Sequence, residues 1–192
     1  MVDPSARRVI NIGLLVLPLL LAGAIVWLSM SDRESPTVDV EAIGPEFTSI
    51  EELAEASQLI VTGTIVDATP GRVLTDPNNP DVGIRTTIFT LDVAESTADD
   101  AGDTITIEYE TSLLDGTPTT IDGIAPPVTG ETGLYFLIAG PSDDYPHHAI
   151  VNHQGRYLLQ DDRTLTALSP DALSQAVAES YPFAIDQIDT AN

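Results

Sequence analysis

The 192-residue sequence contains no cysteine and no lysine, and it has a single tryptophan. The absence of cysteine excludes disulfides, thiolate nucleophiles, cysteine-containing zinc sites and the acylated cysteine that anchors bacterial lipoproteins. An exported domain of this composition must be stable through its apolar core alone. Hydrophobic residues make up 43% of the chain, close to the globular average, so we expect a folded domain.

Positive charge is also scarce. The chain has 30 Asp and Glu residues against seven basic residues, all of them Arg, and a formal net charge of −23. A surface of this sign repels nucleic acid and anionic lipid head groups, so nucleic acid is not expected as a partner. The acidity suits a solubilising surface or adaptation to high salt, where counterions screen self-repulsion. Composition does not separate a salt-loving from a high-GC prokaryotic origin.

One long hydrophobic run interrupts this acidic composition. Residues 9–30 form a stretch without any charged side chain, about 33 Å long as a helix, which matches the hydrocarbon core of a bilayer. Arg7 and Arg8 precede it, and the positive-inside rule places residues 1–8 in the cytoplasm. We predict a single-pass protein of the cell membrane, anchored by this helix, with its C-terminal domain extracellular.

A cleaved signal peptide is the alternative for this segment. The tripeptide Ala22-Gly23-Ala24 has the small-x-small form of a cleavage site. Cleavage there would leave an apolar mature end, and the run is longer than a usual signal core, so we favour an uncleaved anchor. The Arg7-Arg8 pair fits a twin-arginine export signal only in part.

The rest of the chain predicts a stalk, one domain and a short tail. Residues 31–47 are polar and acidic and include Pro36 and Pro45, as expected of a linker. Residues 48–184 are predicted to form the extracytoplasmic domain. Residues 185–192 are predicted to be a C-terminal tail.

Helix starts flank a series of strands in this domain. Thr48 or Ser49 can cap a first helix, since each has a Glu three residues on, and the Ser-Pro-Asp of residues 169–171 can start a second. A turn-rich segment is expected at 69–83, and the apolar run 134–139 should be the most buried strand. Alternating apolar and polar residues predict further strands near 59–65, 89–93, 105–109, 147–153, 156–160 and 164–168.

Short strands with long loops and terminal helices predict a mainly β fold, either a small barrel or a sandwich. The runs SQLIVTGTIVDAT, FTLDVAES, GDTITIEYE and GETGLYFLIAG resemble the strand series of small OB-type barrels. They are similar to netrin-like domains, tissue inhibitors of metalloproteinases and uncharacterised membrane-anchored prokaryotic proteins with a comparable barrel. The resemblance implies an OB-like fold. Inhibitors of that family act through an N-terminal Cys, which this sequence lacks, so inhibition does not carry over.

The three histidines are the first candidate site. His147, His148 and His153 lie within seven residues, with Asp143 and Asp144 just upstream. On an extended strand His147 and His153 would be too far apart to share a metal. We expect exposed histidines that bind no metal or cofactor. The rival interpretation is a divalent-metal site or a pH-sensitive patch.

Two loops are the remaining candidates. Residues 76–81 offer oxygen ligands but depart from the EF-hand pattern, so a plain loop is expected. Residues 112–130 are the longest irregular stretch, and such loops are usually functional or disordered. Its apolar side chains can pack on the barrel or contact a partner, and they are the best candidates for an interaction site: Leu113, Leu114, Ile121 and Ile124.

No catalytic motif is present: the sequence lacks G-x-S-x-G, H-E-x-x-H, a Walker loop and a dinucleotide fingerprint. The leading hypothesis is therefore a non-enzymatic, membrane-tethered interaction module, with the membrane and an unidentified protein as partners. A second hypothesis is a metal-dependent or hydrolytic enzyme that uses the segment 147–153. A third is an accessory subunit whose anchor helix packs against other helices of a membrane complex.

Overall fold

A computed structural model describes residues 36–41, 44–140, 146–160 and 163–180. The chain divides after Pro36 into two units, and the described residues of the second unit carry the β structure. The predicted anchor at 9–30, the cytoplasmic segment and the C-terminal tail lie outside the described residues. Within the described ranges, no helix combines the length and the apolar character that crossing a bilayer requires.

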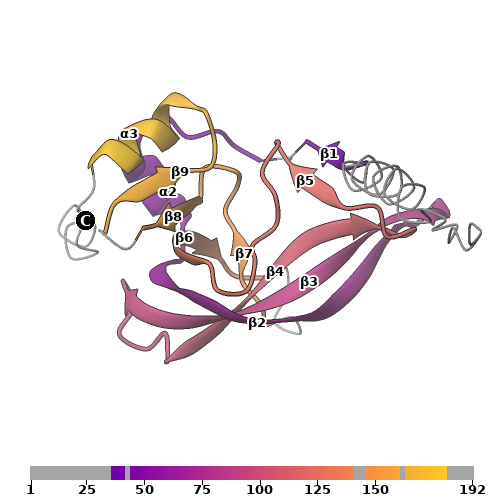
Figure 1. The fold of residues 1–192 in the computed structure, drawn as a ribbon, viewed down its shortest axis with the longest axis horizontal. Helices are drawn as coiled ribbons and strands as arrows, with labels where there is room; N and C mark the ends of the chain where they lie inside the picture. The colour runs from indigo at the N-terminus through magenta and orange to yellow at the C-terminus, as the bar shows by residue number, and fades with distance from the viewer. Residues whose placement is uncertain (1–35, 42–43, 141–145, 161–162, 181–192) are drawn as a thin grey trace, which may run out of the picture. The chain divides into compact units, whose positions relative to one another are not determined.

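Three antiparallel strands form the largest part of the sheet: β2 (Leu59–Asp76), β3 (Asn79–Ser96) and β4 (Thr104–Leu113). The expected turn-rich segment at 69–83 is wrong, because β2 and β3 continue through it as a hairpin (Figure 1). Only two residues turn the chain, and the Asp76 carboxylate accepts a hydrogen bond from the Asn78 amide at 2.7 Å. The prolines and glycines that suggested a loop are instead accommodated by irregularities in the strand pairing.

The remaining strands extend the sheet from β2. They are β6 (Thr132–Ile138), β7 (Ala149–Ile150), β8 (Arg156–Leu159) and β9 (Leu165–Ala167), in the order β4-β3-β2-β6-β8-β9 with β7 paired to β6.

A parallel bridge between Ile107 and His148 connects the β7 segment back to β4. The His148 amide donates to the Thr106 carbonyl, and the Glu108 amide donates to the His148 carbonyl, both at 2.8 Å. Strands β4, β3, β2, β6 and the β7 segment therefore follow one another around a ring.

A separate two-stranded sheet corrects two sequence-based expectations. Strand β1 (Val38–Val40) pairs in parallel with β5 (Thr119–Ile121). The predicted stalk at 31–47 thus contributes a strand to the fold, and the predicted irregular loop at 112–130 contains another. The Asp39 carboxylate fixes the contact by accepting hydrogen bonds from the Thr120 hydroxyl and the Gly123 amide, each at 2.7 Å.

Strand β6 separates two apolar cores, which confirms the prediction that residues 134–139 form the most buried strand. Tyr135 and Leu137 pack in the first core, whereas Leu134 and Phe136 pack in the second, as the alternation of a strand requires. The other buried members of the first core are Leu59, Val61, Ile65, Phe89, Leu91, Ile105 and Ile107. The second core also contains Leu53, Ile60, Tyr157, Leu165 and Val177.

Two short helices cover the second core, α2 (Ile50–Ala56) and α3 (Ala172–Ser180) (Figure 1). The predicted cap of α2 is confirmed: the Ser49 hydroxyl accepts from the Glu52 amide at 3.3 Å, and the Glu52 carboxylate accepts from the Thr48 amide at 2.9 Å. Helix α3 begins two residues later than Ser-Pro-Asp suggested, because Asp171 rather than Ser169 accepts a hydrogen bond from the Ser174 amide, at 2.9 Å.

Candidate functional site

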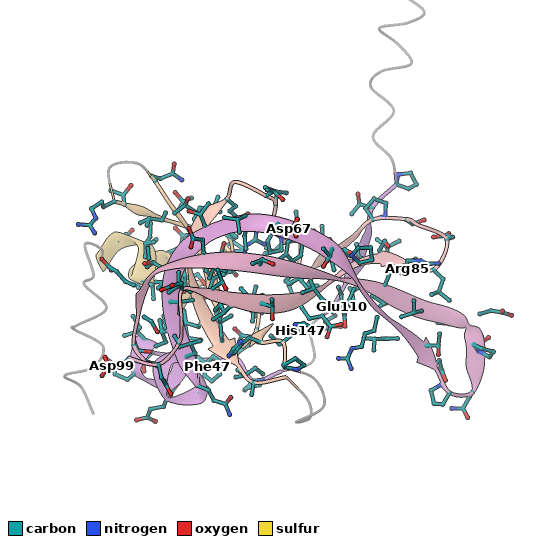
Figure 2. The ribbon with its side chains drawn as sticks, turned by 90° about the horizontal axis from the view of Figure 1, so that it is seen from below. Phe47, Asp67, Arg85, Asp99, Glu110 and His147 are labelled. Atoms are coloured by element: carbon teal, nitrogen blue, oxygen red, sulfur yellow. The ribbon has the colours of Figure 1, made fainter. Side chains whose placement is uncertain are left out.

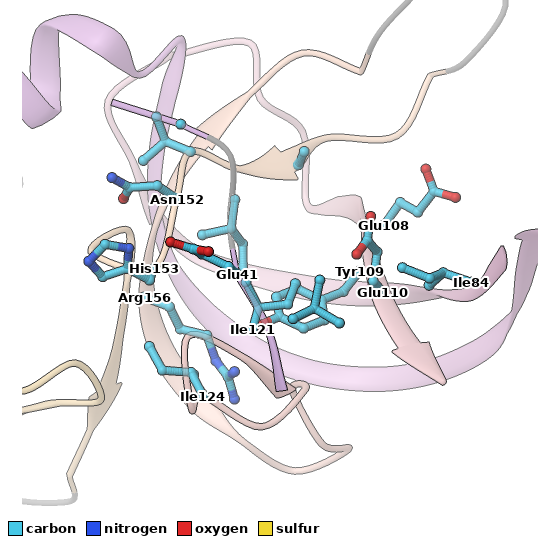
Figure 3. A pocket seen from close by; sticks show the side chains of 15 residues that line it. Glu41, Ile84, Glu108, Tyr109, Glu110, Ile121, Ile124, Asn152, His153 and Arg156 are labelled. Carbon is cyan, nitrogen blue, oxygen red and sulfur yellow. The ribbon is translucent and has the colours of Figure 1, made fainter. Parts of the chain in front are cut away.

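A cavity of about 500 Å³ lies between β4, the β1 segment, residues 121–124 and residues 149–156 (Figure 3). This volume is within the range of small-molecule sites in proteins. Its walls are mainly apolar and combine side chains far apart in the sequence: Val40, Ile84, Tyr109, Ile121, Ile124, Ile150 and Val151.

The long loop meets the cavity through only part of the predicted interaction site. Ile121 and Ile124 line the cavity, and Ile124 is buried. Leu113 and Leu114 do not line it; Leu113 pairs with Ile84 in the β3–β4 ladder. The Leu114 carbonyl accepts hydrogen bonds from the Arg85 guanidinium at 3.2 and 3.3 Å.

A tight turn presents the two loop isoleucines. The amides of Ile121 and Ile124 each donate to the carbonyl of the other, at 3.0 and 2.9 Å. The residues between them, Asp122 and Gly123, both have positive φ, 49° and 76°. An Asp-Gly pair is the strongest short-range hairpin signal, so this turn was readable in the sequence but was missed within a long loop.

The best-formed polar contact of the cavity wall is a buried ion pair that the sequence analysis did not identify. The Arg156 guanidinium donates to the Glu131 carboxylate at 2.9 and 2.5 Å, and these side chains are only 5% and 8% exposed. The Ala125 carbonyl accepts a further hydrogen bond from Arg156 at 2.6 Å. The Tyr135 hydroxyl donates to Glu131 at 3.1 Å, and burial raises the pKa of Tyr135. These contacts hold the loop against β6 and β8.

Carboxylates from β4 occupy the opposite end of the cavity from Arg156 and His153 (Figure 3). The Glu108 carboxylate forms an ion pair with the Arg72 guanidinium, whose nitrogens lie 2.9–3.1 Å from its oxygens. It also accepts a hydrogen bond from the Thr86 hydroxyl at 2.5 Å. Glu110 makes no hydrogen bond or ion pair with any of the described residues. Burial, and then the nearby charge of Glu108, raise the pKa of Glu110.

Tyr109 stands between these two glutamates in the sequence and is partly buried. Burial raises the pKa of its hydroxyl to about 12, with smaller contributions from nearby charges. The phenol therefore stays neutral at physiological pH. It presents an aromatic ring and a hydroxyl, but no charge, to the cavity.

The three histidines do not come together. His153 lines the cavity, with Nδ1 3.1 Å from an Asp122 carboxylate oxygen. His147 Nδ1 lies 2.7 Å from the Thr106 hydroxyl, while His148 Nδ1 is buried without a hydrogen-bond partner among the described residues. Among all the described residues, no group of three or more His, Cys, Asp or Glu side chains is placed so that it could hold a metal ion.

A second cavity, of about 390 Å³, adjoins the first, because both are lined by Glu41, Gly44, Asn152 and His153. Its own walls are more acidic, with Glu46, Asp122 and Asp171. Burial opposes the ionisation of Asp171, but hydrogen bonds from Ser169, Ser174 and Gln154 outweigh it and lower its pKa. The larger, apolar cavity thus has an acidic neighbour on the side of His153.

Comparisons with protein-family models, with curated protein sequences and with solved structures find no match to this chain. What the protein does must therefore be inferred from the geometry of the two cavities and of the residues that line them.

Proposed function

We propose that this chain is a membrane-tethered, extracytoplasmic binding module that is not an enzyme and whose binding site is the larger cavity. The observation that carries the proposal is the convergence of Ile121 and Ile124 from the long loop with β4 and residues 149–153 around one apolar space. Concave, mainly apolar sites of this volume, with a few polar groups at defined positions, are the usual form of a ligand pocket.

The fold proposed for this module is an OB-type barrel. Three features support it: the β2-β3-β4 meander, the pairing of β6 with β2, and the parallel bridge from the β7 segment to β4. Together they give a five-stranded ring of the Greek-key kind. Many OB folds bind nucleic acid, but a net charge of −23 opposes that role here.

The tether proposed for the module is the uncharged run at 9–30, with Arg7 and Arg8 on its cytoplasmic side. Protease added to intact cells should then degrade the domain and leave the anchor. A domain that stays intact under conditions that degrade a known surface protein would contradict this orientation.

Binding, rather than catalysis, is favoured by how the charged groups of the cavity are used. Arg156 forms an ion pair with Glu131, and Glu108 forms an ion pair with Arg72. Charged groups that are paired in this way stabilise the cavity wall. The His153–Asp122 pair is the one observation that favours the hydrolytic alternative, since such a pair can act as a general base. Among the described residues, the lining of the larger cavity offers this pair no serine, threonine or cysteine as a nucleophile. Ser169 lines the adjoining cavity together with Asp122 and His153, but its hydroxyl is 3.5 Å from the Asp171 amide and accepts a hydrogen bond from it.

Photo-crosslinking in native membranes tests the proposal. The full chain would carry a benzophenone amino acid in place of Ile121, in the cavity, or of Val82, which is 54% exposed and lies outside both cavity linings. We expect a discrete adduct from position 121 and none from position 82. Equal labelling at both positions, or no adduct at 121, would contradict a binding role for the cavity.

A further inference from the structure

The charged groups of the larger cavity are not all paired. Arg156, which lines the cavity, is paired with Glu131, and the lining residue Glu108 is paired with Arg72. Glu110 lines the same space and has no hydrogen-bonding or ionic partner among the described residues. The cavity therefore presents a partly buried carboxylate without a partner beside an apolar surface, and the exposed Glu41 adds a second carboxylate to the lining.

A partly buried carboxylate without a partner is unfavourable, because burial removes hydration that nothing replaces. The neighbouring charge of Glu108 adds repulsion, and the raised pKa of Glu110 reports both effects. A cation bound beside Glu110 would remove both penalties. An anion would be repelled by the Glu110 carboxylate, and a neutral ligand would leave the charge of this carboxylate uncompensated.

The surroundings of Glu110 suit a protonated amine. Tyr109 lines the cavity next to it, and an aromatic ring attracts ammonium groups through its face (Figure 3). The walls on either side are the isoleucines Ile84, Ile121 and Ile124. The adjoining cavity contributes further acids, and the net charge of −23 raises the local concentration of cations.

We infer that the cavity binds amphiphilic amines, with the apolar body of the ligand against Ile121, Ile124 and Ile150 and its ammonium group at Glu110. This inference rests on the proposed binding function and adds the ligand class. Charge complementarity selects an amine over an alcohol or a carboxylate of the same shape. Glu110 supplies that selectivity, whereas the apolar walls supply affinity that is independent of the head group.

Three probes that share one apolar cage test the inference: 1-adamantanamine, 1-adamantanol and adamantane-1-carboxylate. Each is titrated calorimetrically into the full chain in discs of zwitterionic lipid, with empty discs as the blank. We expect the amine to bind about tenfold more tightly than the alcohol, the size of effect that a charge-assisted hydrogen bond gives. The carboxylate should bind more weakly than the alcohol.

Two substitutions at Glu110 and one control assign the effect to this residue. Glu110→Gln should lower amine affinity to that of the alcohol and leave alcohol affinity unchanged, so that loss of folding is distinguished from loss of charge. Glu110→Lys should reverse the preference and favour the carboxylate. Glu55→Gln, on the exposed side of α2, should change none of the three affinities.

Equal binding of amine and alcohol, or an amine preference that survives Glu110→Gln, would overturn the inference, as would no binding of any probe. These outcomes leave the binding function to be judged separately, by the adduct at position 121. Selective amine binding without an adduct at position 121 would support the ligand class but contradict a binding role of the cavity in native membranes.

Discussion

The two halves of the β2–β3 hairpin belong to the same pair of antiparallel strands but differ in what covers them. In the inner half, Val61 and Ile65 of β2 and Leu91 of β3 are fully buried. In the distal hairpin, residues 73–83, the exposed fractions of Val73 and Val82 are 48% and 54%, and Figures 1 and 2 show this end projecting from the sheet. Similar β-branched residues therefore form strands in both halves, but only the inner half gains the free energy of apolar burial.

The ion pairs of the chain show the same difference. Arg156–Glu131 is 5% and 8% exposed and lies against the cavity, whereas Arg163–Glu95 is 74% and 44% exposed. Both pairs join a guanidinium to a carboxylate, but solvent screening leaves the exposed pair with almost no contribution to the free energy of unfolding. Burial, rather than residue type, decides which contacts hold the site together.

Breaking the buried ion pair should have the largest effect. Glu131→Gln leaves the Arg156 guanidinium buried beside a neutral amide, and we expect a loss of about 3–5 kcal/mol in the free energy of unfolding. Glu95→Gln, at the exposed pair, should cost less than about 0.5 kcal/mol. Urea unfolding of the full chain in detergent, followed by circular dichroism, measures both. Equal costs would remove the distinction between the two pairs.

Truncation within the hairpin should follow burial in the same way. Ile65→Ala removes a fully buried side chain from the first core and should cost about 2–5 kcal/mol. Val73→Ala, in the distal hairpin, should cost roughly 0.5 kcal/mol or less. The same unfolding experiment applies, and a large cost at Val73 would indicate that the distal hairpin is covered by a partner or by another copy.

Two glycines test how rigidly each half is held. A Cβ placed on Gly63 would overlap the Asp92 carbonyl oxygen, and one on Gly83 would overlap the Leu74 carbonyl oxygen. Gly63→Ala should cost about 1–3 kcal/mol, because the inner half is fixed between packed strands. Gly83→Ala should cost less, since the distal hairpin can shift into solvent. A greater loss of thermal stability at Gly83 than at Gly63 would refute this difference in rigidity.

Glu110 lies opposite Thr86 in the β3–β4 ladder, between the buried inner half and the exposed distal hairpin. Its substitution should change stability least. Its raised pKa means that the folded state loses stability as pH rises through that pKa and the carboxylate ionises. Glu110→Gln should therefore raise the melting temperature at pH 7, by on the order of 1–2 °C after solvent screening, and have no effect at pH 3. A lower melting temperature at pH 7 would show that the carboxylate has a stabilising partner.

Local patterns predicted the local structure well. The Thr-Ser-x-Glu-Glu pattern of residues 48–52 predicted the cap of α2, and the apolar run at 134–139 predicted β6, because each depends on neighbours in the sequence. The distal hairpin was missed because Pro70, Gly71 and Pro80 suggest turns, whereas irregular strand pairing accommodates them.

The candidate site could be predicted only in part. The long loop was identified, and two of its four proposed contact residues line the cavity. The β1–β5 pairing joins residues about 80 positions apart, and Glu131 lies 25 positions from Arg156. Such contacts leave no periodic signal in a single sequence. The chain has only seven basic residues, all Arg, and this scarcity was the one sequence feature that pointed to a specific role for Arg156.

The pairing of β1 with β5 has a mechanical consequence. Thr37 is where the compact unit begins, and β1 follows it directly. Tension applied to the chain at this point loads the β1–β5 hydrogen bonds and the Asp39 contacts with Thr120 and Gly123 before it reaches the larger sheet. A pull along the N-terminal connection would thus act first on the segment that carries Ile121 and Ile124, two residues of the cavity wall.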